Sequence, residues 1–321
     1  MRVLVTGAAG NLGQETIANL LDAQHQVRAF DLPGKHTERL VQRHGARIDQ
    51  FWGDLTQRSD VAGAMRGVDV VIHNAALIPP PSEKRPDLSW RVNVEGTQHV
   101  IDAALAQPTP PRVMLASSIA VYGPRQDQAP PARVDDPIVA TDHYSTHKIE
   151  CEKRLRESGL TWLVTRIGAS PPAKPQGGDP DLLRFMFERD LDSRVEFIHP
   201  KDVGMAQARA VDVEEAWNRV LLLGGGPRCH LRNRDLMHRM FERLGIGALP
   251  DEAFGGEPLY GDWMDTEESQ RLLDYQRHTF DDFLDEVGTQ FGLKRLGVKL
   301  VAPLVRRVLL RYSEAYKKSR N

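Results

Sequence analysis

Tyr144 and Lys148 are the two residues whose types and spacing most directly suggest proton chemistry. On a helix, residues four apart share one face, so the phenol and the ammonium would be neighbours. A phenol with its ordinary pKa of about 10 is a poor base at neutral pH, and a nearby ammonium favours the phenolate. The pair can therefore exchange a proton with an alcohol or carbonyl oxygen. A Tyr-Lys pair alone is more often surface packing, so the interpretation depends on the surrounding elements.

A glycine-rich segment near the start of the chain predicts a dinucleotide site. Gly7, Gly10 and Gly13 stand between an apolar strand candidate at 3–5 and a helix candidate that contains Ile17. Without Cβ atoms the turn can be tight, and a pyrophosphate can approach the backbone and the positive end of the helix. The alternative is a tight strand-to-helix turn that binds no ligand.

Asp31 favours NAD as the dinucleotide. It follows a second strand candidate at 26–30, where a carboxylate can accept hydrogen bonds from the adenosine ribose and would repel the 2′-phosphate of NADP. Arg28, Lys35 and His36 lie nearby and leave some use of NADP open. The alternative role for Asp31 is that of a turn or capping aspartate.

Strands and helices alternate through the first two thirds of the chain. This alternation predicts an α/β fold, a doubly wound parallel sheet of Rossmann type with right-handed crossovers. The strand candidates are 3–5, 26–30, 68–73, 113–116, 160–166 and 220–223, and the helix candidates include 92–106 and 145–157.

The order becomes less regular after Ile167. Residues 170–178 are predicted to form a loop and 182–189 a short helix, whereas 199–203 return the chain to the main domain and Asp202 is expected to cap a helix through Val211. We therefore expect an NAD-binding domain over 1–167 with 199–225, a smaller C-terminal substrate-binding lobe over 168–198 and 226–293, and a basic amphipathic tail over 294–321.

The composition is that of an ordinary soluble protein, with 40% hydrophobic and 27% charged residues. A net charge of -2 gives no reason to expect nucleic-acid binding. Cys151 and Cys229 are too few for a disulfide framework, and no metal site is predicted. The start of the chain shows no signal-peptide pattern, so we expect a cytoplasmic protein.

Several further motifs resemble the extended short-chain dehydrogenase/reductase family, also called the NAD-dependent epimerase/dehydratase family. The resemblance is close over about the first 170 residues and looser beyond them. Besides Tyr144 and Lys148, it rests on residues 6–13, 53–56, 73–76, 93–97, 117–123 and 199–203.

The resemblance implies roles for four catalytic residues. Tyr144 would be the general acid/base, and Lys148 would hold the nicotinamide ribose and lower the pKa of the phenol. Ser118 would donate a hydrogen bond to the reacting oxygen, whereas its neighbour Ser117 is expected to be structural. Asn93 would hold backbone or water geometry near the site. The alternatives are a turn hydroxyl for Ser118 and a helix cap for Asn93.

The resemblance also assigns the cofactor contacts and an assembly. The expected NAD-binding residues, together with Tyr144 and Lys148, are Gly7, Gly10, Asn11, Leu12, Gly13, Asp31, Asp54, Leu55, Asn74, Ala75 and Ala76. Pairing of helices at 98–105 and 145–155 would make a homodimer. His73 and His199 are expected to be structural.

The net reaction is less clearly specified than the redox chemistry. Dehydratases and decarboxylases of the family carry an acidic residue shortly after the catalytic Ser or Thr, but Ile119 and Ala120 occupy those positions here. Dehydrogenation and epimerisation are left. A non-catalytic NAD-sensing module is the alternative of another class, and the presence of Ser118, Tyr144 and Lys148 argues against it.

The small-molecule substrate is open between a nucleotide sugar and a steroid-like or lipid-like alcohol. Cations for a sugar-nucleotide diphosphate could come from Arg184, Arg189, Arg194, Arg228, Arg232 and Arg234. The proline-rich segment 78–86 is either one wall of the substrate pocket or a rigid surface connection.

The basic tail carries nine Lys or Arg residues and one acid, Glu314. An apolar stripe from Leu300 to Tyr312 predicts an amphipathic helix, with Pro303 near its start. Packing against protein is favoured over peripheral contact with an anionic membrane, because most amphipathic helices face a core.

Overall fold

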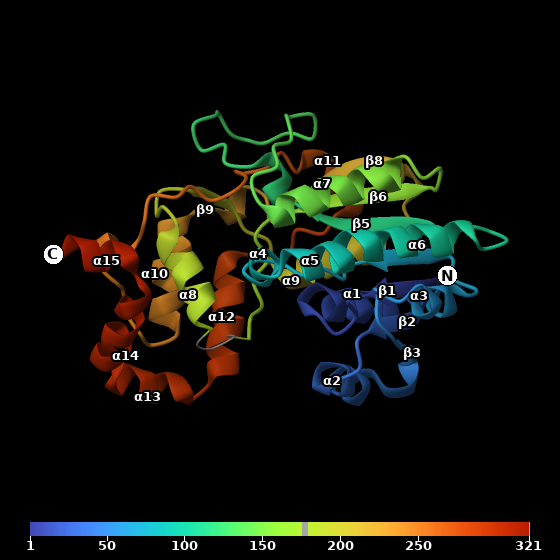
Figure 1. The fold of residues 1–321 in the computed structure, drawn as a ribbon. Coiled ribbons are helices and arrows are strands. Elements are labelled where there is room, and N and C mark those ends of the chain that lie inside the picture. Colours follow the sequence, from blue (N-terminus) through green and yellow to red (C-terminus); the bar gives the residue numbers. More distant parts are fainter. Residues whose placement is uncertain (175–178, 321) are drawn as a thin grey trace.

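A seven-stranded parallel sheet forms the larger part of the protein (Figure 1). The computed structural model describes residues 1–174 and 179–320, so four residues of the predicted loop at 170–178 lie outside the described part. The strands are β1 (Arg2–Thr6), β2 (Gln26–Asp31), β3 (Ile48–Trp52), β4 (Val70–His73), β5 (Arg112–Ser118), β6 (Trp162–Ile167) and β8 (Arg219–Leu223). Their order is β3-β2-β1-β4-β5-β6-β8, which confirms the predicted Rossmann-type sheet.

The sequence analysis missed β3. This strand lies at the edge of the sheet, and β2 is its one partner within residues 1–174 and 179–320. Ile48 is buried but Asp49 and Gln50 are exposed, so the segment lacks the continuous apolar run that marks the inner strands.

Helices cover both faces of the sheet (Figure 1). The side chains of Val3 and Val5 pack in one core cluster with Ile17 and Val203, whereas Leu4 packs in a second cluster with Val100. This alternation is the period of a strand buried on both faces. The helices of this part are α1 (Asn11–Asp22), α2 (Lys35–His44), α3 (Arg58–Met65), α4 (Pro81–Lys84), α5 (Pro86–Trp90), the π-helix η2 (Arg91–Glu95), α6 (Gly96–Leu105), α7 (His143–Arg156) and α9 (Pro200–Ala210).

A smaller lobe lies beside the carboxyl ends of the strands (Figure 1). It contains a two-stranded antiparallel sheet of β7 (Arg194–Glu196) and β9 (His230–Arg232). Its helices are α8 (Pro180–Glu188), α10 (Asn233–Arg243), α12 (Phe280–Phe291), α13 (Lys294–Leu300), α14 (Ala302–Leu309) and α15 (Glu314–Ser319). Two apolar clusters form its core, one around Phe197 and Phe283 and the other around Phe187 and Phe241.

Short 3₁₀ helices complete the secondary structure. They are η1 (Gly45–Arg47), η3 (Ile119–Tyr122), η4 (Glu214–Ala216), η5 (Pro227–Cys229), η6 (Asp251–Ala253) and η7 (Leu310–Tyr312).

Two details differ from the expectations for the C-terminal half. Helix α9 is capped by His199, which accepts a hydrogen bond from the Lys201 amide, whereas Asp202 lies in the first turn and accepts from the backbone of residues 277 and 278. Part of 226–293 also returns to the main domain, because α11 (Glu267–Leu273) contacts β8 and Tyr275 is buried in the core cluster of the sheet.

Candidate active site

Helix α7 brings Tyr144 and Lys148 to the carboxyl end of β5. Asp142 caps the helix by accepting a hydrogen bond from the Ser145 amide at 2.7 Å. The Lys148 ammonium lies 5.7 Å from the centre of the Tyr144 ring and donates to the Ala116 carbonyl at 2.5 Å. The phenol and the ammonium therefore share one face of the helix, as their spacing predicts.

The protein environment keeps the Tyr144 phenol protonated. Burial raises its pKa to about 12, and interaction with the Ser118 side chain opposes this rise only in part. Burial also lowers the pKa of Lys148. The protein alone thus favours the proton-donor form of Tyr144, which departs from the expectation that Lys148 lowers the pKa of the phenol.

Ser118 and Ser117 end β5 but have different surroundings. The Ser118 hydroxyl accepts from the Ala120 amide at 3.1 Å and is close enough to Tyr144 to affect its pKa. The Ser117 hydroxyl donates to the Glu152 carboxylate at 2.5 Å inside the core. Glu152 in turn forms a buried ion pair with Arg166. The structure therefore gives Ser117 a structural partner and leaves Ser118 beside the phenol.

The sequence analysis missed Glu83 as a neighbour of the catalytic pair. Its carboxylate, on α4 of the proline-rich segment, accepts hydrogen bonds from the His143 and Tyr144 amides, both at 3.1 Å. These amides begin α7 and have no partner within the helix. The segment 78–86 is thus fixed to the helix that positions Tyr144, and only the negative charge at its centre could have suggested this contact.

The glycine loop has the close approaches that a dinucleotide cradle requires. Gly7 adopts a φ of +65°, and a Cβ there would lie 2.8 Å from the Ala75 amide nitrogen. A Cβ on Gly13 would lie 2.1 Å from the Gly7 carbonyl oxygen. Helix α1 begins directly after Gly10, so its free amides face the loop. The glycines thus let the loop fold tightly on itself, and the free amides at the start of α1 fit the pyrophosphate of NAD.

The residues around the loop fix its shape. Asp31 accepts a hydrogen bond from the Ala9 amide at 2.9 Å, which places its carboxylate beside the loop. The Asn11 amide group donates to the Ser170 carbonyl at 3.0 Å and joins the loop to the start of the smaller lobe. Leu12 packs partly buried against the same core as the sheet. Asp31 thus occupies the strand end at which an adenosine ribose would bind.

Other predicted cofactor residues are used to hold elements together. The Asn74 side chain exchanges hydrogen bonds with Gln207 of α9 at 2.7 and 3.0 Å, so its remaining group near the site is the backbone. Ala75 and Ala76 follow it in the same strand-end segment, and Asp54 accepts from the Thr56 amide at 2.8 Å.

Leu55 and Asn93 lie beside the π-helix η2. Leu55 is buried and packs closely on Gly96, because a Cβ added to Gly96 would lie 2.6 Å from the Leu55 Cγ. Asn93 donates to the Leu77 carbonyl at 2.9 Å and accepts from the Leu77 amide at 2.7 Å. A single π turn often occurs at functional sites, and this one presents Asn93 to the segment that follows β4.

His73 and His199 have structural surroundings. His73 is buried between the hydroxyls of Thr6 and Thr97, and burial lowers its pKa to about 3. Burial lowers the pKa of His199 to about 4, and its ring packs on His278. Both imidazoles are neutral at physiological pH.

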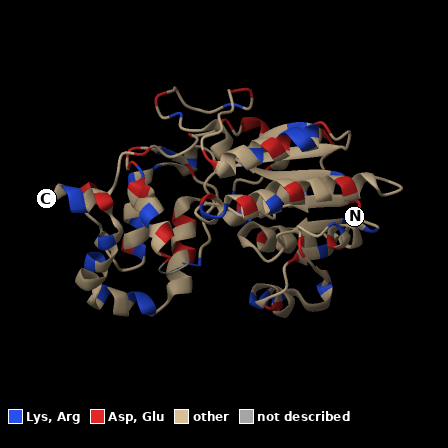
Figure 2. Ribbon diagram, viewed as in Figure 1, with Lys and Arg blue, Asp and Glu red and all other residues tan. Residues whose placement is uncertain are grey.

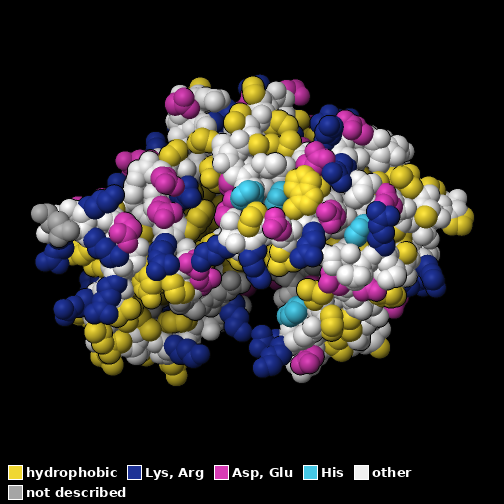
Figure 3. All heavy atoms as spheres, in the orientation of Figure 1, with side chains coloured by type: hydrophobic (Ala, Val, Ile, Leu, Met, Phe, Trp, Pro, Cys, Tyr) yellow, Lys and Arg dark blue, Asp and Glu magenta, His cyan; other side chains and the backbone are white. Residues whose placement is uncertain are grey.

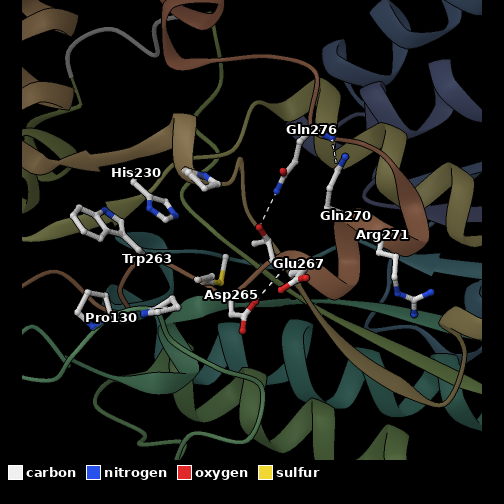
Figure 4. A pocket seen from close by; sticks show the side chains of 12 residues that line it. Pro130, His230, Trp263, Asp265, Glu267, Gln270, Arg271 and Gln276 are labelled. Carbon is white, nitrogen blue, oxygen red and sulfur yellow. Dashed lines mark hydrogen bonds between the residues drawn. The ribbon is translucent and has the colours of Figure 1, made fainter.

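A cavity of about 730 Å³ lies between the smaller lobe and the sheet domain, and its lining does not include Ser118, Tyr144 or Lys148 (Figure 4). The rings of His230 and Trp263 stack at its edge with their centres 5.0 Å apart. His230 is paired with the buried Glu196 at 3.1 Å. Since these contacts join β7 and β9 to the segment before α11, they are structural.

Comparison with known proteins identifies the family. The model of the NAD dependent epimerase/dehydratase family matches residues 3–224, which include the glycine loop, Ser118, Tyr144 and Lys148. The chain belongs to this family. The predicted family and NAD as its cofactor are thereby confirmed.

Curated relatives are similar over part of their length. The 3 beta-hydroxysteroid dehydrogenase type 7 of Rattus norvegicus is 35% identical over 60% of this chain and 61% of its own length. The 3-beta-hydroxysteroid dehydrogenase of Mycolicibacterium neoaurum is 29% identical over 61% of this chain and 54% of its own. The chain therefore spans less than two thirds of the length of these relatives.

Solved structures share the fold at low identity. A UDP-glucose-4-epimerase from Stenotrophomonas maltophila with bound NAD superimposes with a TM-score of 0.75 and 20% identity, over 94% of this chain and 100% of that one. A short-chain dehydrogenase/reductase superfamily protein from Agrobacterium tumefaciens with bound NAD superimposes with a TM-score of 0.75 and 22% identity, over 94% of this chain and 99% of that one. These structures support the architecture of both the sheet domain and the smaller lobe.

Proposed function

We propose that the chain is an NAD-dependent oxidoreductase that interconverts a secondary alcohol and a ketone in a small, largely apolar molecule of hydroxysteroid type. The observation that carries the proposal is that the Tyr144 phenol lies near both the Lys148 ammonium and the Ser118 hydroxyl. NAD, when bound, supplies hydride exchange at the carbon. The glycine loop and Asp31 would hold its pyrophosphate and adenosine ribose, and Lys148 its nicotinamide ribose.

The residues of the chain would handle the proton. In ketone reduction, the protonated Tyr144 donates its proton to the carbonyl oxygen while Ser118 donates a hydrogen bond to the same oxygen. In alcohol oxidation, Tyr144 must accept the proton, which requires positive charge beside the phenol. Asn93 and Glu83 would act as positioning residues, because they fix the segment after β4 and the start of α7.

The arginines of the smaller lobe favour an apolar alcohol over a nucleotide sugar. Of the six considered, five have acceptors within the chain, and a diphosphate would have to replace these contacts. The contacts are Arg184 with Asp181, Arg189 with Glu257, Arg194 with Asp262, Arg232 with the Asp192 carbonyl, and Arg234 with Asp251. The curated relatives named above support the same choice.

The segment that follows Ser118 is apolar and closely packed. Ile119 and Ala120 are buried, and Ile119 lies in one cluster with Met264. A Cβ on Gly261 would lie 2.3 Å from the Ile119 side chain, so Ile119 fills the space against Gly261 and makes this wall apolar. This packing supports simple dehydrogenation or reduction over dehydration.

A substrate screen tests the proposal. The protein is incubated with NAD and 3β-hydroxysteroids, with NADH and the matching ketones, and with UDP-sugars, and NADH absorbance and product formation are followed. We expect turnover of steroid-type substrates that falls at least about 100-fold in Tyr144→Phe while NAD binding is retained. Epimerised UDP-sugar without net change in NADH would contradict the substrate class. NAD binding without any Tyr144-dependent turnover would indicate a non-catalytic module.

We also propose a cytoplasmic homodimer paired through α6 and α7. Leu105, at the end of α6, is an exposed large apolar side chain on one of the two helices, which supports the pairing. Light scattering after size exclusion should give the mass of a dimer for the wild type and a smaller mass for Leu105→Asp; a monomer in the wild type would contradict it.

A further inference from the structure

The most unusual surface of the protein lies on α13 and α14. Thirteen large apolar side chains are exposed among the described residues, and six of them fall between 293 and 308. They are Leu293, Leu296, Leu300, Val301, Leu304 and Val308, and we call this set the apolar ridge. Leu293 and Leu300 are 83% and 86% exposed, which is nearly complete exposure for leucine. Exposed patches of this kind mark sites of interaction.

The apolar ridge is not the outcome of a tail that has failed to pack. The residues that directly follow the ridge are docked on the smaller lobe, where Leu309, Leu310 and Tyr312 pack against the cluster around Phe187. The Ser313 hydroxyl donates to the Ala253 carbonyl at 2.5 Å. The tail is therefore anchored just after the ridge, while the ridge itself faces solvent.

Basic residues surround the apolar ridge. No Asp or Glu occurs between Leu293 and Ser313, and the six cations in this stretch are Lys294, Arg295, Lys299, Arg306, Arg307 and Arg311. Figure 2 shows basic positions without acidic ones along α13 and α14, and Figure 3 shows apolar side chains with basic neighbours at the lower edge of the smaller lobe. The surface is both apolar and strongly positive.

The spacing of the ridge allows shallow insertion. Leu296 and Leu300 lie four residues apart on α13, and Leu304 and Val308 lie four apart on α14, so each helix presents an exposed apolar pair on one face. Among the described residues, no helix is both long and apolar enough to cross a bilayer. A surface of this type instead lies in the plane of the interface, with leucines among the acyl chains and cations at the headgroups.

We propose that the apolar ridge and its basic border dock the protein on an anionic lipid surface. Charge decides between this occupant and a second copy of the chain. A two-fold contact through the ridge would bring the same cations of two copies together without acids to offset them. Anionic headgroups complement the cations, and acyl chains cover the leucines. Docking is independent of the substrate and would hold the smaller lobe against the bilayer.

Vesicle co-sedimentation of the full-length protein without substrate tests the proposal. The vesicles are phosphatidylcholine alone or phosphatidylcholine mixed with phosphatidylglycerol. The ridge is altered in Leu300→Ser/Leu304→Ser, with Ile138→Ser/Val139→Ser as the control at exposed apolar positions elsewhere. The border is altered in Lys299→Glu/Arg307→Glu, with Arg39→Glu/Arg66→Glu as the control at exposed cations of the sheet domain.

We expect binding to the anionic vesicles that weakens with added salt. The ridge and border variants should each bind at least about tenfold more weakly, and both controls should bind like the wild type. Thermal melts check that every variant is folded, and the border variant and the salt dependence still test the proposal if the ridge variant unfolds. The proposal is overturned if the wild type does not bind vesicles or binds phosphatidylcholine alone equally well. It is also overturned if the wild type is a dimer that does not bind vesicles and the ridge variant is a monomer.

Discussion

Glu152→Gln should destabilise the protein far more than Glu150→Gln, two positions earlier on α7. Glu152 and Arg166 are 3% and 4% exposed and pair at 2.8 Å, and Ser117 donates to the same carboxylate at 2.5 Å. Removing one partner of a buried ion pair costs about 3–5 kcal/mol, because the other charge is left without compensation. Since Gln keeps one acceptor oxygen, we expect Glu152→Gln to lower the free energy of unfolding by about 3 kcal/mol, the low end of this range.

Glu150 provides the matched control. It pairs with Arg154 at 2.7 Å, but both side chains are about one third exposed, at 31% and 30%. An exposed pair at this spacing contributes about 0.3–0.5 kcal/mol. Urea unfolding followed by circular dichroism gives both free energies, provided that the dependence on urea is unchanged between variants. If the two variants lose free energy of unfolding to the same extent within about 0.5 kcal/mol, burial does not make the Glu152–Arg166 pair more important than the exposed one.

Three further predictions follow from the site. Ultraviolet titration of the wild type minus that of Tyr144→Phe, both without cofactor, should isolate one phenol with a pKa of about 12, because Tyr275, whose pKa burial also raises to about 12, titrates in both proteins. A difference centred near pH 10 would contradict the effect of burial on Tyr144. Gly13→Ala should abolish NAD binding measured by calorimetry, because the added Cβ would lie 2.1 Å from the Gly7 carbonyl oxygen. Gly297→Ala, whose added Cβ would have no atom within 4 Å, should bind NAD normally. In the folded protein the pKa values of His73 and His199 are about 3 and 4, below the ordinary value of 6.5. Their contribution to the free energy of unfolding is therefore present above pH 6.5 and is lost as the pH falls, and at pH 4 protonation of His73 alone should lower that free energy by roughly 3 kcal/mol. A free energy of unfolding in urea that stays constant between pH 6.5 and 4 would refute this.

The tail shows how a sequence pattern can be incomplete. The apolar stripe from Leu300 to Tyr312 predicts one face that packs against protein. In the structure, Leu309 and Tyr312 do pack, but Leu300 and Leu304 point away from the lobe. Spacing defines a face of a helix only relative to its own axis, so it does not reveal how much of that face the neighbouring elements cover.

The sequence by itself determined the features that depend on near neighbours. Gly7 and Gly13, the apolar strands and the spacing of Tyr144 and Lys148 act within one strand-turn-helix unit or one helix turn, so their types and intervals suffice. The family resemblance added the expected role of Ser118. The sequence analysis did not predict the edge strand β3, because its exposed residues interrupt the apolar pattern.

Only the tertiary structure decided which distant groups meet. It brought Glu83 to the start of α7, joined Asn74 to Gln207, and placed Glu152 against Arg166. These pairs are polar residues in segments without a distinctive pattern, and a polar side chain does not specify its partner until packing removes water and leaves one acceptor within reach. The same packing raised the pKa of Tyr144, since burial depends on what surrounds the phenol and not on its position in the chain.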